Sequence, residues 1–249
     1  MNEKVFNNYS EYYDIFYKDK DYIGEKNYLV NLLKKHNLSK NKLLEFGSGS
    51  GKHGRLLAME GYSVHGIEKS KKMIALAEQG DGFTCEEGDI CNLKLGKKFD
   101  AIFSLFHVMS YQTTNNQINQ VFKSANMHLV KNGLFIFDAW FTPGVYYQQP
   151  SVRYKKIKYE NLEIFRIAEP INKINSNIVD INYTILIKDT KNNSLQTITE
   201  KHSMRHFSVP EIKLFAENNG FEHLQSEEFL TSKVPSKNSW TICNVFKKT

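Results

Sequence analysis

The chain has 249 residues, which is enough for one sizeable domain with an elaboration or for two small domains, and its 41% hydrophobic content can build a core. No run approaches the ~18 apolar residues of a membrane-spanning helix. The start Met1-Asn2-Glu3-Lys4 lacks the apolar segment of a signal peptide. We therefore expect a soluble, cytoplasmic protein with no membrane partner.

The chain is basic, with a formal net charge of +6 and a pI of about 9.0. Such a charge suggests an acidic partner, either nucleic acid or a phosphorylated small molecule. The lysines are spread along the whole sequence, however, which favours a solvated surface. Cys85, Cys91 and Cys243 form an odd, scattered set with neither disulfide nor zinc spacing, so we expect core cysteines and no metal site.

Residues 1–40 are expected to form a helical and aromatic lid, with a helix over about 24–35. Tyr13, Tyr17 and Tyr22 recur at near-helical spacing before it. Two interpretations stay open. The tyrosines either form the core face of an amphipathic helix, or they cover a cationic ligand, because aromatic faces attract cations and phenolic hydroxyls orient polar groups.

The most informative segment is an apolar strand that carries Glu45 and runs into a turn with glycines at 47, 49 and 51. Glycine is needed where the backbone takes positive φ or where a ligand approaches it closely. The helix that follows presents unpaired N–H groups to such a ligand. The segment therefore indicates a nucleoside cofactor.

Spacing and charge narrow the choice of cofactor. A triphosphate-binding loop is excluded, because Phe46 and His53 occupy positions where it needs a glycine and a Ser or Thr. A G-x-G-x-x-G pattern does begin at Gly49, so the pattern alone leaves nicotinamide and flavin enzymes open. Glu45 argues against them, because its carboxylate repels a pyrophosphate and attracts the ammonium of an amino-acid-bearing nucleoside such as S-adenosylmethionine.

Two more acids follow the next predicted strands. Glu68 ends a strand over 63–67 and lies nineteen residues beyond Gly49, where a carboxylate typically holds a ribose diol. Asp89 follows a short strand near Phe83 and could accept from an adenine amino group. Each acid alone is more often a surface charge, but three acids at successive strand ends favour a nucleoside site.

The fourth and fifth predicted strands, over 99–105 and 133–138, read as continuous apolar runs of a parallel sheet. Their carboxyl ends should form the rim of the active site. His107 and Tyr111 follow the fourth strand, and His107 is either a proton acceptor or a structural histidine. Asp138 ends the fifth strand and either fixes a nucleophile or caps the turn.

Residues 151–207 depart from a simple doubly wound domain. Four β-rich runs, over 152–158, 162–167, 178–188 and 195–207, are separated by asparagine-containing turns and predict an antiparallel flap. A helix should begin at Val209 and end at Gly220, before a last strand over 240–246. Trp140 and Tyr146 could stack on a sugar or base, and Arg153 and Arg205 could clamp phosphates, although a single arginine on a hairpin is more often a surface charge.

Residues 40–140 resemble the core of class I S-adenosylmethionine-dependent methyltransferases. The resemblance implies an α/β fold with a Rossmann-like, seven-stranded, doubly wound sheet and an inserted antiparallel flap. It divides the chain into a lid (1–40), a core (41–145), a flap (146–207) and a closing helix and strands (208–249). The cofactor residues that it implies are Tyr13, Tyr17, Tyr22, Glu45, Gly47, Ser48, Gly49, Glu68, Lys69, Met73, Gly88, Asp89, Ile90, Leu105 and Phe106. Met73 has an equally good interpretation as a core methionine.

Three short motifs, 13–17, 138–143 and 202–207, resemble the branch that N-methylates amino groups of nucleotide-linked deoxyamino sugars. This branch keeps a histidine where Tyr111 stands, which leaves His107, Tyr111 and Asp138 as catalytic candidates. The implied product is S-adenosylhomocysteine, and a homodimer is compatible with the resemblance. Alternatives are an O-methyltransferase of a sugar or other small molecule, an RNA methyltransferase, for which no RNA-binding module or catalytic signature is present, and a sensor that binds the cofactor without turnover.

Overall fold

The computed structural model describes residue 12 and residues 15–38 and 41–249. Tyr13, one of the tyrosines expected in the lid, lies outside the described residues. None of the helices within this part of the chain is long and apolar enough to cross a membrane.

Seven strands form the core sheet, in the order β3-β2-β1-β4-β5-β11-β10. Their bounds are β1 Lys42–Phe46, β2 Ser63–Glu68, β3 Phe83–Glu87, β4 Phe99–Ser104, β5 Leu129–Phe141, β10 Phe221–Glu228 and β11 Thr241–Lys248. The first five are parallel, and β11 and β10 run antiparallel to their neighbours. The strand order reverses between β1 and β4, where open α/β sheets bind their ligands, and this confirms the predicted Rossmann-like class.

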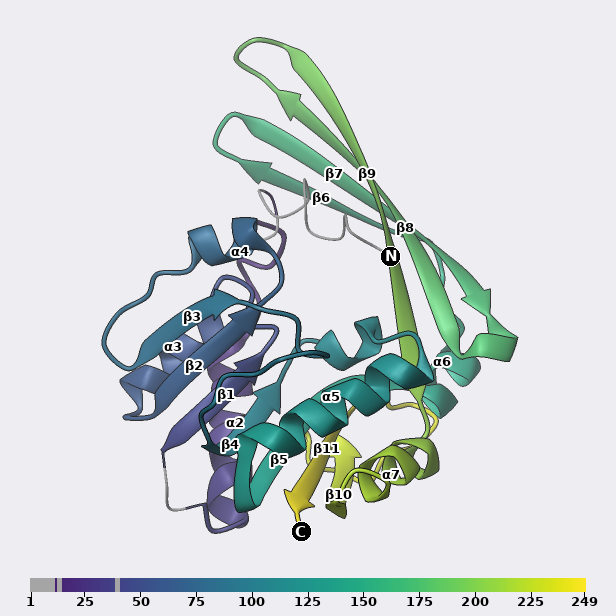
Figure 1. Cartoon of the computed structure of the whole chain (residues 1–249). Coiled ribbons are helices and arrows are strands. Elements are labelled where there is room, and N and C mark those ends of the chain that lie inside the picture. The colour runs from purple at the N-terminus through teal and green to yellow at the C-terminus, as the bar shows by residue number, and fades with distance from the viewer. Residues whose placement is uncertain (1–11, 13–14, 39–40) are drawn as a thin grey trace.

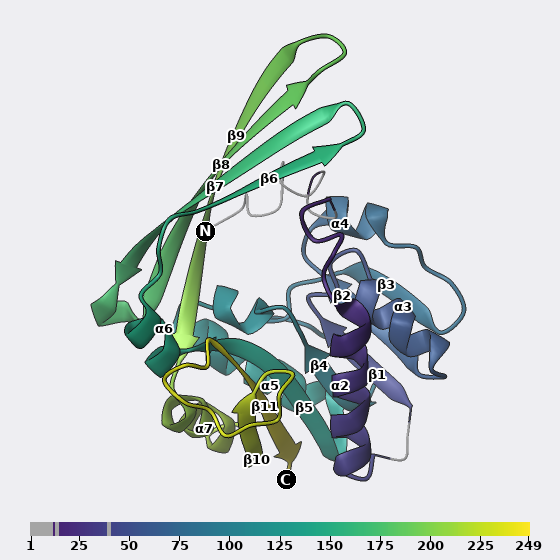
Figure 2. The ribbon, with the colours of Figure 1, turned by 180° about the vertical axis from the view of Figure 1, so that it is seen from behind.

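Helices cover both faces of this sheet (Figures 1 and 2). On one face, α2 (Tyr22–Lys35) and α3 (Lys52–Met59) share an apolar cluster with β1 and β2. On the other face, α5 (Asn115–His128) and α7 (Val209–Glu217) pack on a cluster that includes Phe135 and Phe246. The short helix α4 (Lys71–Leu76) follows β2. Both faces of the parallel strands are therefore buried, as their uninterrupted apolar sequences require.

Local sequence sets the ends of several helices. Thr114 and Gln117 form a capping box at the start of α5, and Ser208 and Glu211 form another at α7. The Asp21 side chain accepts from the Gly24 N–H at the start of α2. Each of these side chains satisfies a backbone donor that has no partner inside its helix.

Four long antiparallel strands form the flap: β6 Arg153–Tyr159, β7 Leu162–Lys173, β8 Ile178–Asp189 and β9 Ser194–Phe207. The flap is a curved sheet that extends away from the core (Figure 1). Parallel pairs Trp140–His206 and Phe141–Phe207 join β9 to the end of β5, and we call these two pairs the seam. The hydrogen-bonded sheet therefore contains eleven strands, more than the predicted seven, because β5 runs on to Phe141 and pairs with both β11 and β9.

The helix α6 (Thr142–Gln148) begins directly after the seam, with Pro143 in its first turn. Short 3₁₀ helices, η1 (Val108–Tyr111) and η2 (Ile174–Ser176), follow β4 and β7. One face of the flap packs on the segment before α2, residues 15–21, which we call the N-terminal arm. Phe16 is buried there against isoleucines of the flap strands, Ile164, Ile185, Ile187 and Ile198. The arm therefore lies between the flap and the core.

Candidate active site

The glycine turn between β1 and α3 has the conformation that its sequence demands. Gly47, Gly49 and Gly51 have φ values of +73°, +54° and +76°, in the left-handed region that favours glycine. The N–H groups of Gly47 and Ser48 donate to the Ile67 carbonyl at 2.8 and 3.1 Å. These bonds fix the turn against the end of β2, and Gly51 caps α3.

Glu68 is attached to this turn by backbone hydrogen bonds. Its Oε2 accepts from the Gly49 N–H at 2.9 Å, and its Oε1 accepts from the Ser70 N–H at 2.8 Å. Burial raises the pKa of Glu68. Met73 is buried, and its Cε lies 3.4 Å from the place that a Cβ on Gly49 would take, so Met73 borders the turn.

Asp89 lies beyond β3 and pairs with Lys69. Lys69 Nζ donates to Asp89 Oδ2 at 3.1 Å, and the Cys91 N–H donates to Oδ1 at 2.9 Å. The Gly88 N–H donates to the Glu68 carbonyl at 2.9 Å. Ile90 is buried in the core beside it. Glu68, Lys69 and Asp89 thus lie together beside the turn, and their roles toward a ribose and an adenine stay predictions.

Glu45 has a buried carboxylate that is only partly compensated, because burial outweighs the hydrogen bond from the Gly54 N–H in its effect on the pKa. It is only 2% exposed, and its Oε2 has no hydrogen-bond partner among the described residues. Burial, and after it the negative charge of Glu68, raises the pKa of Glu45 well above its usual range. A buried carboxylate oxygen without a partner is costly, and a cation beside it would remove the cost. The site therefore fits the ammonium of S-adenosylmethionine.

A buried polar network, which the sequence analysis missed, extends from Glu45 to the arm. His53 places Nδ1 3.8 Å from Glu45 Oε1 and Nε2 2.6 Å from Glu25 Oε2. Glu25 also pairs with Lys20, whose Nζ lies 4.3 Å from the centres of two aromatic rings, Tyr22 and Phe106. Burial lowers the pKa of both Lys20 and His53. The only signal in the sequence was that Glu25 and His53 are polar residues at helix positions that usually hold core side chains.

Tyr17 and Tyr22 both lie next to the site. The Tyr17 ring is edge-on to Phe106, with centroids 4.9 Å apart, and Arg166 of the flap donates to the Tyr17 hydroxyl at 3.2 Å. The Tyr22 ring is 5.1 Å from the His53 ring. Tyr17 thus joins the flap to the loop after β4, while Tyr22 covers the buried network.

The loop after β4 places His107 against Asp138. Leu105 is buried, and Phe106 and His107 have φ values of +67° and +66°, which cost about 1–2 kcal/mol per residue outside glycine. The His107 N–H donates to Asp138 Oδ1 at 2.9 Å, and His107 Nδ1 lies 2.7 Å from Oδ2, a charge contact without hydrogen-bond alignment. The completely buried Asp138 therefore fixes the backbone of His107 and lies against its ring.

Two of the predicted substrate residues are aromatic. Trp140 lies two positions beyond Asp138, with its ring 6.2 Å from His107 and 5.3 Å from Trp240. Tyr146, on α6, donates to the Ile174 carbonyl at 3.0 Å. Of these two residues, Trp140 is the one that lies beside His107, and the contact of Tyr146 anchors the turn between β7 and β8, which lies beside α6 (Figure 1).

The two predicted phosphate clamps lie elsewhere. Arg205 is 7% exposed and donates to Glu211 at 2.6 Å and to Asn115 at 2.7 Å, so it joins β9 to α7 and α5. Arg153 begins the edge strand β6 and pairs with Ala168. Neither contact set brings an arginine to His107, and a phosphate-binding role for them stays a prediction.

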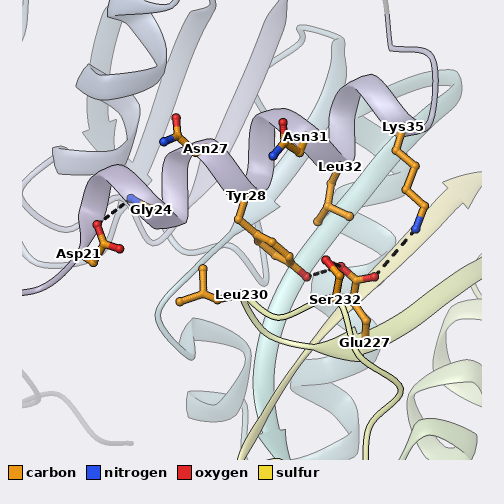
Figure 3. Close-up of a pocket in the computed structure, with 10 residues that line it drawn as sticks. All are labelled: Asp21, Gly24, Asn27, Tyr28, Asn31, Leu32, Lys35, Glu227, Leu230 and Ser232. Carbon is orange, nitrogen blue, oxygen red and sulfur yellow. Dashed lines mark hydrogen bonds and ion pairs between the residues drawn. The ribbon is translucent and has the colours of Figure 1, made fainter.

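A separate hollow of about 360 Å³ lies between α2 and the segment after β10 (Figure 3). Tyr28 donates to Glu227 there at 2.7 Å, and Glu227 also accepts from Ser232 and pairs with Lys35. None of the predicted site residues lines this hollow. The Glu227 carboxylate already has these partners within the protein, in contrast to Oε2 of Glu45.

Comparison with known proteins identifies the class. Residues 43–133 match the family described as "Methyltransferase domain". A curated relative from Streptomyces venezuelae, a dTDP-3-amino-3,4,6-trideoxy-alpha-D-glucopyranose N,N-dimethyltransferase, is 23% identical over 180 residues, which cover 71% of this chain and 76% of the relative. The chain is thus an S-adenosylmethionine-dependent methyltransferase.

Solved structures agree in fold. The sugar N-methyltransferase KedS8 from a Streptoalloteichus species has a TM-score of 0.80 at 19% identity and covers 94% of this chain and 92% of its own. CalS10, an amino pentose methyltransferase from Micromonospora echinaspora solved with S-adenosylmethionine bound, has a TM-score of 0.77 at 20% identity over the whole of both chains. The flap is therefore part of the shared architecture.

Proposed function

We propose that this enzyme N-methylates the amino group of a nucleotide-linked deoxyamino sugar. The observation that carries the proposal is the His107–Asp138 pair beside Trp140 at the carboxyl ends of β4 and β5. An imidazole with an aromatic neighbour suits an acceptor that must lose a proton and that presents a sugar face. The names of the S. venezuelae relative, KedS8 and CalS10 support an amino sugar.

S-adenosylmethionine, when bound, supplies the methyl group from a sulfonium centre. In the proposed site, Glu45 holds its ammonium, Glu68 holds the ribose hydroxyls, and the glycine turn accepts the methionine end. Lys69 and Asp89 border the adenine, and Tyr17 and Tyr22 cover the ligand from the arm. Such alignment of donor and acceptor is worth ~7 to 11 kcal/mol in intramolecular reactions.

His107 acts on the acceptor. An amino sugar is largely an ammonium ion at neutral pH, and its nitrogen has no lone pair for attack until a proton leaves. Contact with Asp138 on Nδ1 leaves Nε2 to accept a hydrogen bond from the acceptor nitrogen and to orient it. The freed nitrogen lone pair is then the nucleophile for the methyl group that the bound donor would supply.

The test is product analysis with labelled methyl donor. The enzyme is incubated with nucleotide-linked 3-amino and 4-amino deoxysugars and with the matching hydroxyl sugars, and products are identified by mass spectrometry. We expect one or two methyl groups on the amino compounds only. Methylation of the hydroxyl sugars, or label transfer to RNA alone, would contradict the proposal.

A further inference from the structure

A second polar chain reaches the same loop from the flap. The Tyr111 hydroxyl lies 2.9 Å from His202 Nδ1, and His202 Nε2 lies 3.2 Å from Glu200 Oε2. Tyr111 ends η1 in the core, four residues after His107, whereas both partners are on β9 of the flap. The side chains of His202 and Glu200 are 3% and 7% exposed, so this contact is shielded from water.

We propose that Tyr111, His202 and Glu200 form a proton relay that carries the acceptor's proton from the active site into the flap. The proposal rests on the function proposed above, because it requires an acceptor that arrives protonated. It assigns roles to His202 and Glu200, which neither the sequence motifs nor the comparisons gave them. Tyr111 would touch the acceptor, and the other two residues would act through it as positioning residues.

The chemistry of the three groups, with Glu200 ionised and His202 neutral, sets the direction of the hydrogen bonds. An ionised Glu200 can only accept, so His202 carries its hydrogen on Nε2. The Nδ1 of a neutral imidazole is then an acceptor, and the Tyr111 hydroxyl must donate to it. The phenolic oxygen therefore presents its lone pairs, as a serine hydroxyl does toward a histidine and a carboxylate in a hydrolase triad.

This arrangement allows the Tyr111 phenol, which is a very weak base, to accept a proton from the acceptor. A phenol cannot hold a second proton at neutral pH, so Tyr111 can take one only while it gives its own away. In the proposed step the O–H bond of Tyr111 breaks toward His202 Nδ1 as an N–H bond of the ammonium breaks toward the Tyr111 oxygen. The products are a neutral amine, an intact phenol and an imidazolium, whose charge Glu200 stabilises.

Neighbouring contacts hold the relay in register. The Tyr183 ring packs edge-on to His202, with centroids 4.9 Å apart, and the Arg166 guanidinium lies 5.4 Å from the Tyr183 ring. The Trp140 N–H donates to Ser110 Oγ at 3.2 Å, which ties η1 to β5. Tyr111, Trp140 and Tyr183 all pack against one apolar cluster that includes Val179 and Met204, so the relay lies close to Trp140.

The experiment uses the full-length enzyme and an amino sugar that the wild type methylates. We expect Tyr111→Phe and His202→Gln each to lower kcat about 10²-fold near neutral pH, and Glu200→Gln to lower it less. The loss should shrink from about pH 6 to about pH 9, as more acceptor arrives deprotonated. The double variant should be no slower than either single variant, because both remove one pathway.

Thr199→Val is the matched control, since Thr199 neighbours Glu200 on β9 but is exposed, and it should leave the pH profile unchanged. Thermal unfolding and calorimetric binding of S-adenosylhomocysteine show whether a variant is folded. A kcat near the wild-type value, or a loss that is equal at all pH values, would overturn the relay alone. If the wild type transfers no methyl group to any amine, the proposed function and the relay both fail.

Discussion

The flap and the glycine turn each bury a carboxylate, but they differ in how many hydrogen-bond donors they give it. In the flap, Asp180 is 2% exposed and accepts from Lys173, Lys201 and Ser203 at 2.6 Å each. Burial acts to raise its pKa, but these bonds outweigh burial and hold the pKa at about 2. At the turn, Glu45 is equally buried, and its Oε2 lacks a partner within the described residues. The paired acid stabilises the fold, whereas we propose that the other receives a cationic ligand.

Asp138→Asn is expected to give the largest effect, because it alters an acid whose partner is catalytic. Loss of the charge beside Nδ1 should disturb the orientation and tautomer of His107 and lower kcat about 10²-fold. Cofactor affinity should change less than kcat, since the direct contacts of Asp138 are with the backbone and ring of His107. Steady-state kinetics with calorimetry check both quantities, and a variant that loses cofactor affinity while keeping kcat would contradict this assignment.

Glu45→Gln separates ligand binding from stability. Removing the charge should weaken S-adenosylmethionine binding by about 2 kcal/mol, roughly 30-fold, while the free protein keeps or gains thermal stability. Glu86→Gln, an exposed carboxylate on β3, is the matched control. If Glu45→Gln unfolds at a lower temperature and binds normally, Glu45 is structural and the contrast with Asp180 is wrong.

Acid should weaken cofactor binding through the same residue. The pKa of Glu45 is raised in the free protein and should fall when an ammonium lies beside it, so the complex holds fewer protons. Affinity should therefore rise with pH across the range in which Glu45 ionises, with proton release on binding. Calorimetry in buffers of different ionisation enthalpy measures this release, and Glu45→Gln should abolish it.

Asp180→Asn should have the smallest effect, a loss of about 1 kcal/mol in unfolding free energy at neutral pH. Its folded pKa lies below the unfolded value, so its stabilisation is present above about pH 4 and is lost as pH falls toward 2. Urea unfolding at neutral and acid pH tests this, because the variant should lose less stability on acidification than the wild type. Methyl transfer should be unaffected.

The sequence predicted features that depend on neighbours along the chain. The glycine turn, the strand ends at Glu68 and Asp89, and the flap hairpins follow from local patterns and turn chemistry. The His53–Glu25 contact spans 28 positions and the Tyr111–His202 contact spans 91, so no local pattern could reveal them. The extension of β5 to Phe141 was missed because the strand was expected to end at Asp138.

One strand serves both halves of the molecule. Within four residues, β5 presents the acid that positions His107, the tryptophan beside it and the two pairs of the seam. A tilt of the flap must therefore turn the backbone that carries Asp138. Acceptors that contact the flap should thus change kcat as well as affinity. Shortening the distal hairpin around Asn192 should change acceptor preference at constant cofactor affinity. Competition assays with acceptors of different size can measure this change.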